Sequence, residues 1–187
     1  MTTTAPTPDS PADRLRVVRR ADRESMWFLG DLVQLIITGD MTEGRLMVAY
    51  HHSRPASQPP LHEHDAEDEI FYLLEGEITF WSAGREEVLG AGDSIVLPRD
   101  VPHTFQVSPD AEARWLVFLT PGGFESFFRE VGVPNDYDGP QLDWTSDEDT
   151  ERRLHAAAER AGITILAPAG TRTLPGSHPE PGTAASP

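Results

Sequence analysis

The chain has 187 residues, a length that suits one well-buried domain with extensions. Its formal net charge of −16 argues against a nucleic-acid partner, because phosphates require a basic surface. It contains no cysteine, which excludes disulfides and thiolate ligands, so any metal must be bound through nitrogen and oxygen. We find no apolar leader and no run of membrane length in the sequence, which favours a cytoplasmic protein without a membrane partner.

The chain is expected to begin with a flexible arm, residues 1–24, because its start is rich in Thr, Pro, Ala and Ser. Within this arm, the alternating basic and aliphatic residues 14–20 indicate a short strand or an extended arm. Short alternating segments separated by glycine-containing turns then predict an all-β barrel over residues 25–122. Besides the histidine segments described next, the expected strands are residues 31–39, 45–53, 77–81, 85–89 and 113–120.

One segment of this barrel carries two histidines in alternation. His62 and His64 point the same way on a strand, because side chains alternate with period 2. Glu69 can join them if the polar residues 65–68 form a turn. Phe71 and Leu73 would then follow Glu69 into the interior.

A third histidine, His103, begins a strand after a turn that contains Pro98 and Pro102. Three imidazoles and one carboxylate form a borderline-soft ligand set. The predicted metal ligands are therefore His62, His64, Glu69 and His103. We expect one divalent transition metal per chain, with Fe, Mn, Ni, Co, Cu and Zn all left open.

Together the two segments resemble the two signature motifs of the cupin superfamily. The first motif matches at His62, His64, Glu69 and Gly76, and the second at Gly92, Pro98 and His103. Ala56 and Asp100 stand where these motifs usually have glycine. The resemblance implies a single cupin double-stranded β-helix, a jelly-roll barrel with short C-terminal helices. It also implies a homodimer, in which the N-terminal arm pairs with another subunit.

The region after the barrel predicts helices. Residues 120–132 place Phe124, Phe127, Phe128 and Val131 on one side of a short helix, which we interpret as a lid over one end of the barrel. This segment is similar to the corresponding region of quercetin-dioxygenase-like cupins. A second helix is expected over residues 147–161, with its start at Ser146. The helical extension is predicted to cover 123–167, with 163–166 docking on the barrel, and 168–187 to form a disordered tail in which His178 is solvated.

The resemblance implies a mononuclear metal-dependent dioxygenase of the quercetinase type, acting with O2 on a flavonol-like or other aromatic or enolic small molecule. Glu69 is the predicted catalytic proton acceptor. The predicted substrate walls are Phe71, Leu73, Trp81, Phe105 and Trp115. One of the neighbours His51 and His52 can face the interior, where it could carry a proton.

Two alternatives stay open at the level of the sequence. The same ligands would serve a non-redox isomerase, lyase or cyclase acting on a dicarbonyl or polyketide-like substrate. A third possibility is a non-catalytic small-molecule-binding module, because one fold hosts many functions.

Overall fold

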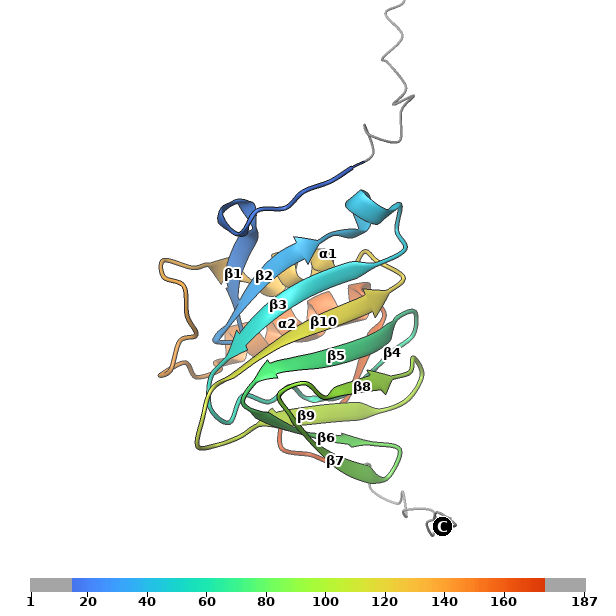
Figure 1. Ribbon diagram of the computed structural model, residues 1–187. Helices are drawn as coiled ribbons and strands as arrows, with labels where there is room; N and C mark the ends of the chain where they lie inside the picture. Colours follow the sequence, from blue (N-terminus) through green and yellow to red (C-terminus); the bar gives the residue numbers. More distant parts are fainter. Residues whose placement is uncertain (1–14, 174–187) are drawn as a thin grey trace, which may run out of the picture.

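The computed structural model describes residues 15–173 and consists of two antiparallel sheets with two α-helices across one opening between them (Figure 1). The seven-stranded sheet has the order β11-β1-β2-β3-β10-β5-β8, and the five-stranded sheet has the order β12-β4-β9-β6-β7. This is the predicted all-β jelly-roll arrangement. The strands are β1 (Glu24–Phe28), β2 (Asp31–Ile37), β3 (Met47–Ser53), β4 (Leu61–His64), β5 (Asp68–Glu75), β6 (Glu77–Ser82), β7 (Arg85–Gly90), β8 (Ser94–Leu97), β9 (His103–Val107), β10 (Ala113–Thr120), β11 (Val133–Pro134) and β12 (Ile163–Ala167).

The core lies between the inner faces of the two sheets. In β10, alternate residues are buried, which follows from the period-2 alternation of a strand with one face in the core. Trp115 is opposite His51 of β3 and Val117 is opposite Phe71 of β5, so inward side chains form rows across the sheet. In the other sheet, Phe80 of β6 is paired with Phe105 of β9.

The helices connect the two sheets. Helix α1 (Glu125–Val131) contacts β1, α2 (Glu148–Arg160) contacts β12, and the two helices contact each other. In Figure 1 they lie behind the seven-stranded sheet. Phe127, Phe128 and Val131 of α1 are buried, as the apolar side of the predicted helix requires. The helices therefore close one opening of the barrel.

The predicted extension contributes strands as well as helices. Residues Ile163–Ala167 do more than dock on the barrel, because they form β12 and pair with β4. The two residues of β11 pair with Met26 and Trp27 of β1. The predicted boundary at residue 122 thus falls between segments that contribute strands to the same two sheets. The predicted domain limits stay predictions.

One local prediction was wrong in detail, and another had left two alternatives open. Residues 15–19 have no regular secondary structure, which fits the extended arm and not the short strand, and a 3-10 helix follows at Arg20–Asp22. The second helix is capped by Asp147, whose carboxylate accepts a hydrogen bond from the Thr150 N–H at 2.8 Å. Ser146 donates to the Glu151 carboxylate instead. Residues 1–14 and 174–187, including His178, lie outside the described part of the chain.

The turns that frame the histidine segments keep a left-handed backbone without always using glycine. Ala56 has a φ of 57° and Asp100 a φ of 59°, at the two positions where the cupin motifs usually have glycine. Gly76 has a φ of 87°, and a Cβ there would lie 2.5 Å from the Glu112 carbonyl oxygen. Turn shape is therefore retained at the substituted positions, whereas Gly76 is required by close packing.

No helix within residues 15–173 has the length and apolar character needed to cross a membrane.

Candidate metal centre and ligand cavity

The structure brings the four predicted metal ligands together at one end of the barrel. His62 and His64 lie on β4, and His62 is directly paired with His103 on β9. Glu69 reaches them from β5 in the other sheet, after the bend at residues 65–67. One ligand atom from each of the four residues lies within 4.8 Å of all the others.

Backbone carbonyls orient two of the imidazoles. His62 donates from Nδ1 to the Pro60 carbonyl at 2.9 Å, and His103 donates from Nδ1 to the Val101 carbonyl at 2.9 Å. Because a carbonyl only accepts, these bonds fix the proton on Nδ1 and leave Nε2 for the centre of the cluster. This is the hydrogen-bonding pattern of metal-binding histidines.

His64 has buried nitrogens without a hydrogen-bond partner in the described chain. It is 1% exposed, its Nε2 lies 3.9 Å from Glu69 Oε2, and its Nδ1 lies 3.5 Å from Glu67 Oε2. A buried polar atom without a partner costs free energy. A cation between His64 and Glu69 would remove this cost on one side of the ring, while Glu67 would orient the other side.

The electrostatics of the cluster favour a positive charge. Burial would raise the pKa of Glu69, but the contact with His103 and the charges of the three histidines lower it to about 2. Burial would lower the pKa of His64, yet Glu67 and Glu69 together raise it. Burial lowers the pKa of His62 to about 3, with the neighbouring His103 and His64 acting in the same direction. A positive charge beside Glu69 is thus favourable, and the low pKa of His62 leaves its ring with a free lone pair.

The contact between Glu69 and His103 supports the same conclusion. Glu69 Oε2 lies 3.2 Å from His103 Nε2. Since the Nδ1 proton of His103 is already used by Val101, this contact is a hydrogen bond only if the ring is an imidazolium. A metal ion between the two groups would satisfy both. The cluster could therefore hold a metal, and its three nitrogens and one oxygen suit a divalent transition metal.

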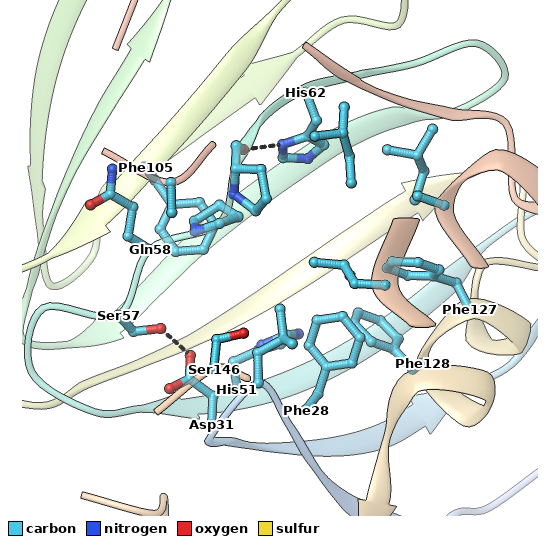
Figure 2. Close-up of a pocket in the computed structure, with 18 of the residues that line it drawn as sticks. Phe28, Asp31, His51, Ser57, Gln58, His62, Phe105, Phe127, Phe128 and Ser146 are labelled. Atoms are coloured by element: carbon cyan, nitrogen blue, oxygen red, sulfur yellow. Dashed lines mark hydrogen bonds between the residues drawn. The ribbon is translucent and has the colours of Figure 1, made fainter. Parts of the chain in front are cut away.

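The cluster opens into a cavity of about 570 Å³ between the two sheets and the helices. His62, His64 and Glu69 line one part of it, and the side chains in Figure 2 surround the rest. The aromatic wall consists of Phe28, Phe105, Trp115, Phe124, Phe127, Phe128 and Trp144. The polar lining away from the cluster consists of Asp31, His51, Arg54, Ser57, Gln58, Ser146 and Glu151.

Only two of the five predicted wall residues line this cavity. Phe105 and Trp115 do so, whereas Phe71, Leu73 and Trp81 do not. Phe71 points inward as expected but lies behind Trp115, with ring centroids 4.6 Å apart. Trp81 alternates away from Phe80, donates from Nε1 to Glu86, and stacks under the guanidinium of Arg172 at 4.4 Å.

The sequence reasoning missed the walls that come from outside the barrel strands, above all Phe28, Asp31 and Trp144. The apolar side of the 120–132 helix was a usable signal for Phe124, Phe127 and Phe128, which were assigned to a lid without a place in the cavity. The choice between the neighbouring histidines is settled by register. His51 faces the cavity, and His52 points to the other face of the sheet, where it is buried and its Nε2 lies 2.7 Å from a Glu112 carboxylate oxygen.

Comparison with known proteins agrees with the fold and the motifs. Residues 49–119 match the family model described as Cupin domain. The chain therefore contains a cupin domain, and the resemblance seen in the sequence is confirmed.

Its sequence is similar to quercetin 2,3-dioxygenases. It is 32% identical over 111 residues to that of Bacillus subtilis strain 168, an alignment that covers 59% of this chain and 32% of the relative. It is 38% identical over 78 residues to that of Aspergillus japonicus, covering 38% of this chain and 22% of the relative. The alignments thus span a third or less of these curated relatives. Among solved structures, KdgF from Halomonas sp. has a TM-score of 0.51 at 16% identity, covering 58% of this chain and 94% of that one, which supports the fold alone.

Proposed function

We propose that this protein is a metal-dependent dioxygenase that acts on a flavonol-like or other aromatic, enolic small molecule. The observation that carries the proposal is the four-residue His/Glu cluster at one end of a cavity of about 570 Å³ with aromatic walls. This volume lies within the usual range of small-molecule sites. The similarity to two quercetin 2,3-dioxygenases supports the same reaction class.

His62, His64, Glu69 and His103 would hold the metal. When bound, a divalent transition metal supplies Lewis acidity for an enolic oxygen and a centre at which O2 can react. The protein contributes the rigid positions of the ligands: β4 and β9 fix the imidazoles, and carbonyl groups fix their tautomers.

Glu69 is the proposed proton acceptor for the enol. It lines the cavity, its side chain is 12% exposed, and it is ionised because its pKa is low. A carboxylate that lines the cavity beside the other metal ligands would come within hydrogen-bond reach of an enol bound there, which is the geometric requirement for a general base. The aromatic wall would orient a flat substrate and exclude water from the reacting oxygen.

Oxygen uptake tests the proposal. Protein reconstituted separately with Fe, Mn, Co, Ni, Cu or Zn is given a flavonol, and substrate loss and O2 consumption are measured together. A dioxygenase consumes one O2 for each substrate molecule. Glu69→Gln should lower turnover by about 100-fold or more.

His52→Ala is the matched control, because it removes a histidine of β3 that does not line the cavity. It should retain wild-type turnover. Substrate conversion without O2 consumption would contradict the dioxygenase and favour the non-redox alternative. Tight binding without turnover for any metal would favour a binding module.

We also propose that the protein is a homodimer. The outer face of the seven-stranded sheet carries Tyr72 and Leu74 of β5, 42% and 44% exposed, beside Val96 of β8, 60% exposed. Neighbouring apolar side chains on an outer sheet face suit a partner surface. Sedimentation velocity should give the mass of two chains, and a monomer at micromolar concentration would refute this assembly.

A further inference from the structure

The cavity has a second polar region that the proposed metal chemistry does not use. Val33 of β2 is paired with His51 of β3, so Asp31 and His51 project from the same face of the seven-stranded sheet. In Figure 2, Asp31, Ser57 and His51 lie across the cavity from His62. A ligand held at the metal cluster would therefore present its other end to these residues.

His51 is held in place by aromatic contacts but lacks a polar partner. Its ring stacks on Trp115 with centroids 3.9 Å apart and meets Phe128 edge-on at 5.5 Å. It is 5% exposed, and its Nε2 has no hydrogen-bond partner within the described residues. Burial lowers its pKa to about 3, so the ring is neutral. A buried imidazole nitrogen at the wall of a cavity, without a protein partner, points to a ligand atom.

Asp31 supplies the complementary charge. It is 7% exposed, and its carboxylate accepts hydrogen bonds from the Arg54 N–H at 3.1 Å and the Ser57 hydroxyl at 2.6 Å. An ionised carboxylate can accept about four hydrogen bonds, so Asp31, which lines the cavity, has room for a further donor. No ion pair of the described chain involves Asp31, which leaves it able to bind a hydrogen-bond donor on a ligand.

We propose that His51 and Asp31 form a second recognition site, which binds a hydroxyl group on the end of the substrate remote from the metal. A hydroxyl group both donates and accepts, so it can donate to Asp31 and pair with the neutral His51 ring. A carboxylate would be repelled by the ionised Asp31. The substrate class is therefore an aromatic enol with a further hydroxyl on a distant ring, an inference that rests on the proposed function.

Binding of matched ligands tests this site. The parent probe is 3-hydroxyflavone, and its partners carry one additional hydroxyl at the 7, 3′ or 4′ position. Affinities for the metal-loaded protein are measured without oxygen, by quenching of tryptophan fluorescence, since Trp115 and Trp144 line the cavity. At least one hydroxylated probe should bind about 10-fold more tightly than the parent, as expected for a hydrogen bond to a charged group.

Two variants assign this preference to the site. Asp31→Asn and His51→Phe should each reduce it to about threefold or less, while affinity for the parent probe changes by about threefold at most. The phenylalanine retains stacking on Trp115. Glu130→Gln, a change on α1 at a residue that pairs with Arg160 and does not line the cavity, is the control and should keep the full preference. Thermal unfolding and metal content verify that each variant is folded and loaded.

The outcomes separate this inference from the proposed function. If the parent binds but hydroxylated probes gain nothing, or if the preference survives in either folded variant, the second site is refuted and the proposed substrate class stands. If no probe binds the metal-loaded protein, the proposed substrate class fails, and this site fails with it. If Asp31→Asn fails to fold, His51→Phe and Ser57→Ala are measured in its place. The second site then requires that His51→Phe loses the preference for the hydroxylated probes.

Discussion

The metal cluster and the rest of the cavity wall differ in where the chain supplies them. All four members of the metal cluster come from residues 62–103, within the segment that matches the cupin family model. Asp31 and Phe28 precede that segment, and Phe124, Phe127 and Phe128 follow it. The family segment thus supplies the metal cluster, whereas flanking segments supply much of the wall. Similarity within residues 49–119 therefore says more about the reacting centre than about the shape of the substrate.

The largest effect should come from removing a ligand. His62→Ala or His103→Ala is expected to lower metal affinity on the order of 1,000-fold, because one of four ligands is lost from a site that binds through all of them. Elemental mass spectrometry of protein reconstituted and then desalted measures this effect. His52→Ala should keep about one metal per chain. Metal retention in both ligand variants would contradict the site.

A change in the flanking wall should do the opposite, lowering stability while sparing the metal. Phe128→Ala removes a ring that is 5% exposed and contacts His51, Phe28 and Phe124. We expect a loss of about 3 kcal/mol or more in the free energy of unfolding, measured in urea. Metal content should stay at the wild-type value. Loss of metal together with stability would show that the two regions are not separable.

Asp31 should give the flanking region its own pH dependence. Burial raises the pKa of Asp31 from 3.8 to about 6, against the opposing hydrogen bonds from Ser57 and Arg54. The folded state therefore holds this proton more tightly than the unfolded state. Its contribution to stability is fully present below about pH 4 and is lost as the pH rises to about 6, an effect of about 3 kcal/mol.

The Asp31→Asn variant should not show this loss of stability with rising pH. The measurement is the free energy of unfolding in urea for wild type and variant, from pH 4 to pH 7. In the difference between the two proteins, the contributions of the other titrating groups largely cancel. The difference should shift in favour of the variant as the pH rises. A constant difference would show that the Asp31 carboxyl has an ordinary pKa.

The smallest expected effect concerns the start of α2. Asp147→Ala removes the carboxylate that accepts the Thr150 N–H, which should cost about 1 kcal/mol of stability. Ser146→Ala is the comparison, because Ser146 lies next to the cap without filling that role, and it should cost less. Equal losses of stability in the two variants would contradict the assignment of the N-cap to Asp147 and favour Ser146, the helix start expected from the sequence.

The metal cluster was predictable because it depends on short-range rules. The spacing of His62 and His64 follows from strand alternation, and the polar insert before Glu69 has the composition of a turn. The apolar side of α1 was predictable for the same reason, since helical periodicity is local. These features need no knowledge of which strands become neighbours.

The cavity wall was less predictable because it depends on depth and on distant pairing. Phe71 and Trp115 were both expected to face inward, but only the packing of one ring on the other decides which meets the ligand. Alternation showed that His51 and His52 face opposite ways without showing which is inside. The pairing of Val33 with His51 supplies that answer, and no local pattern encodes it.

The pairing of β12 with β4 bears on how the protein assembles. Ile163 is opposite His64 and Ile165 is opposite His62, and each pair joins residues roughly 100 positions apart in the chain. On its other side, β4 meets β9 through the His62–His103 pair. The strand that carries two ligands therefore gains its second neighbour only after residues 163–167 have left the ribosome. Closing so long a loop is slow, which makes a fully ordered metal site a late event in folding.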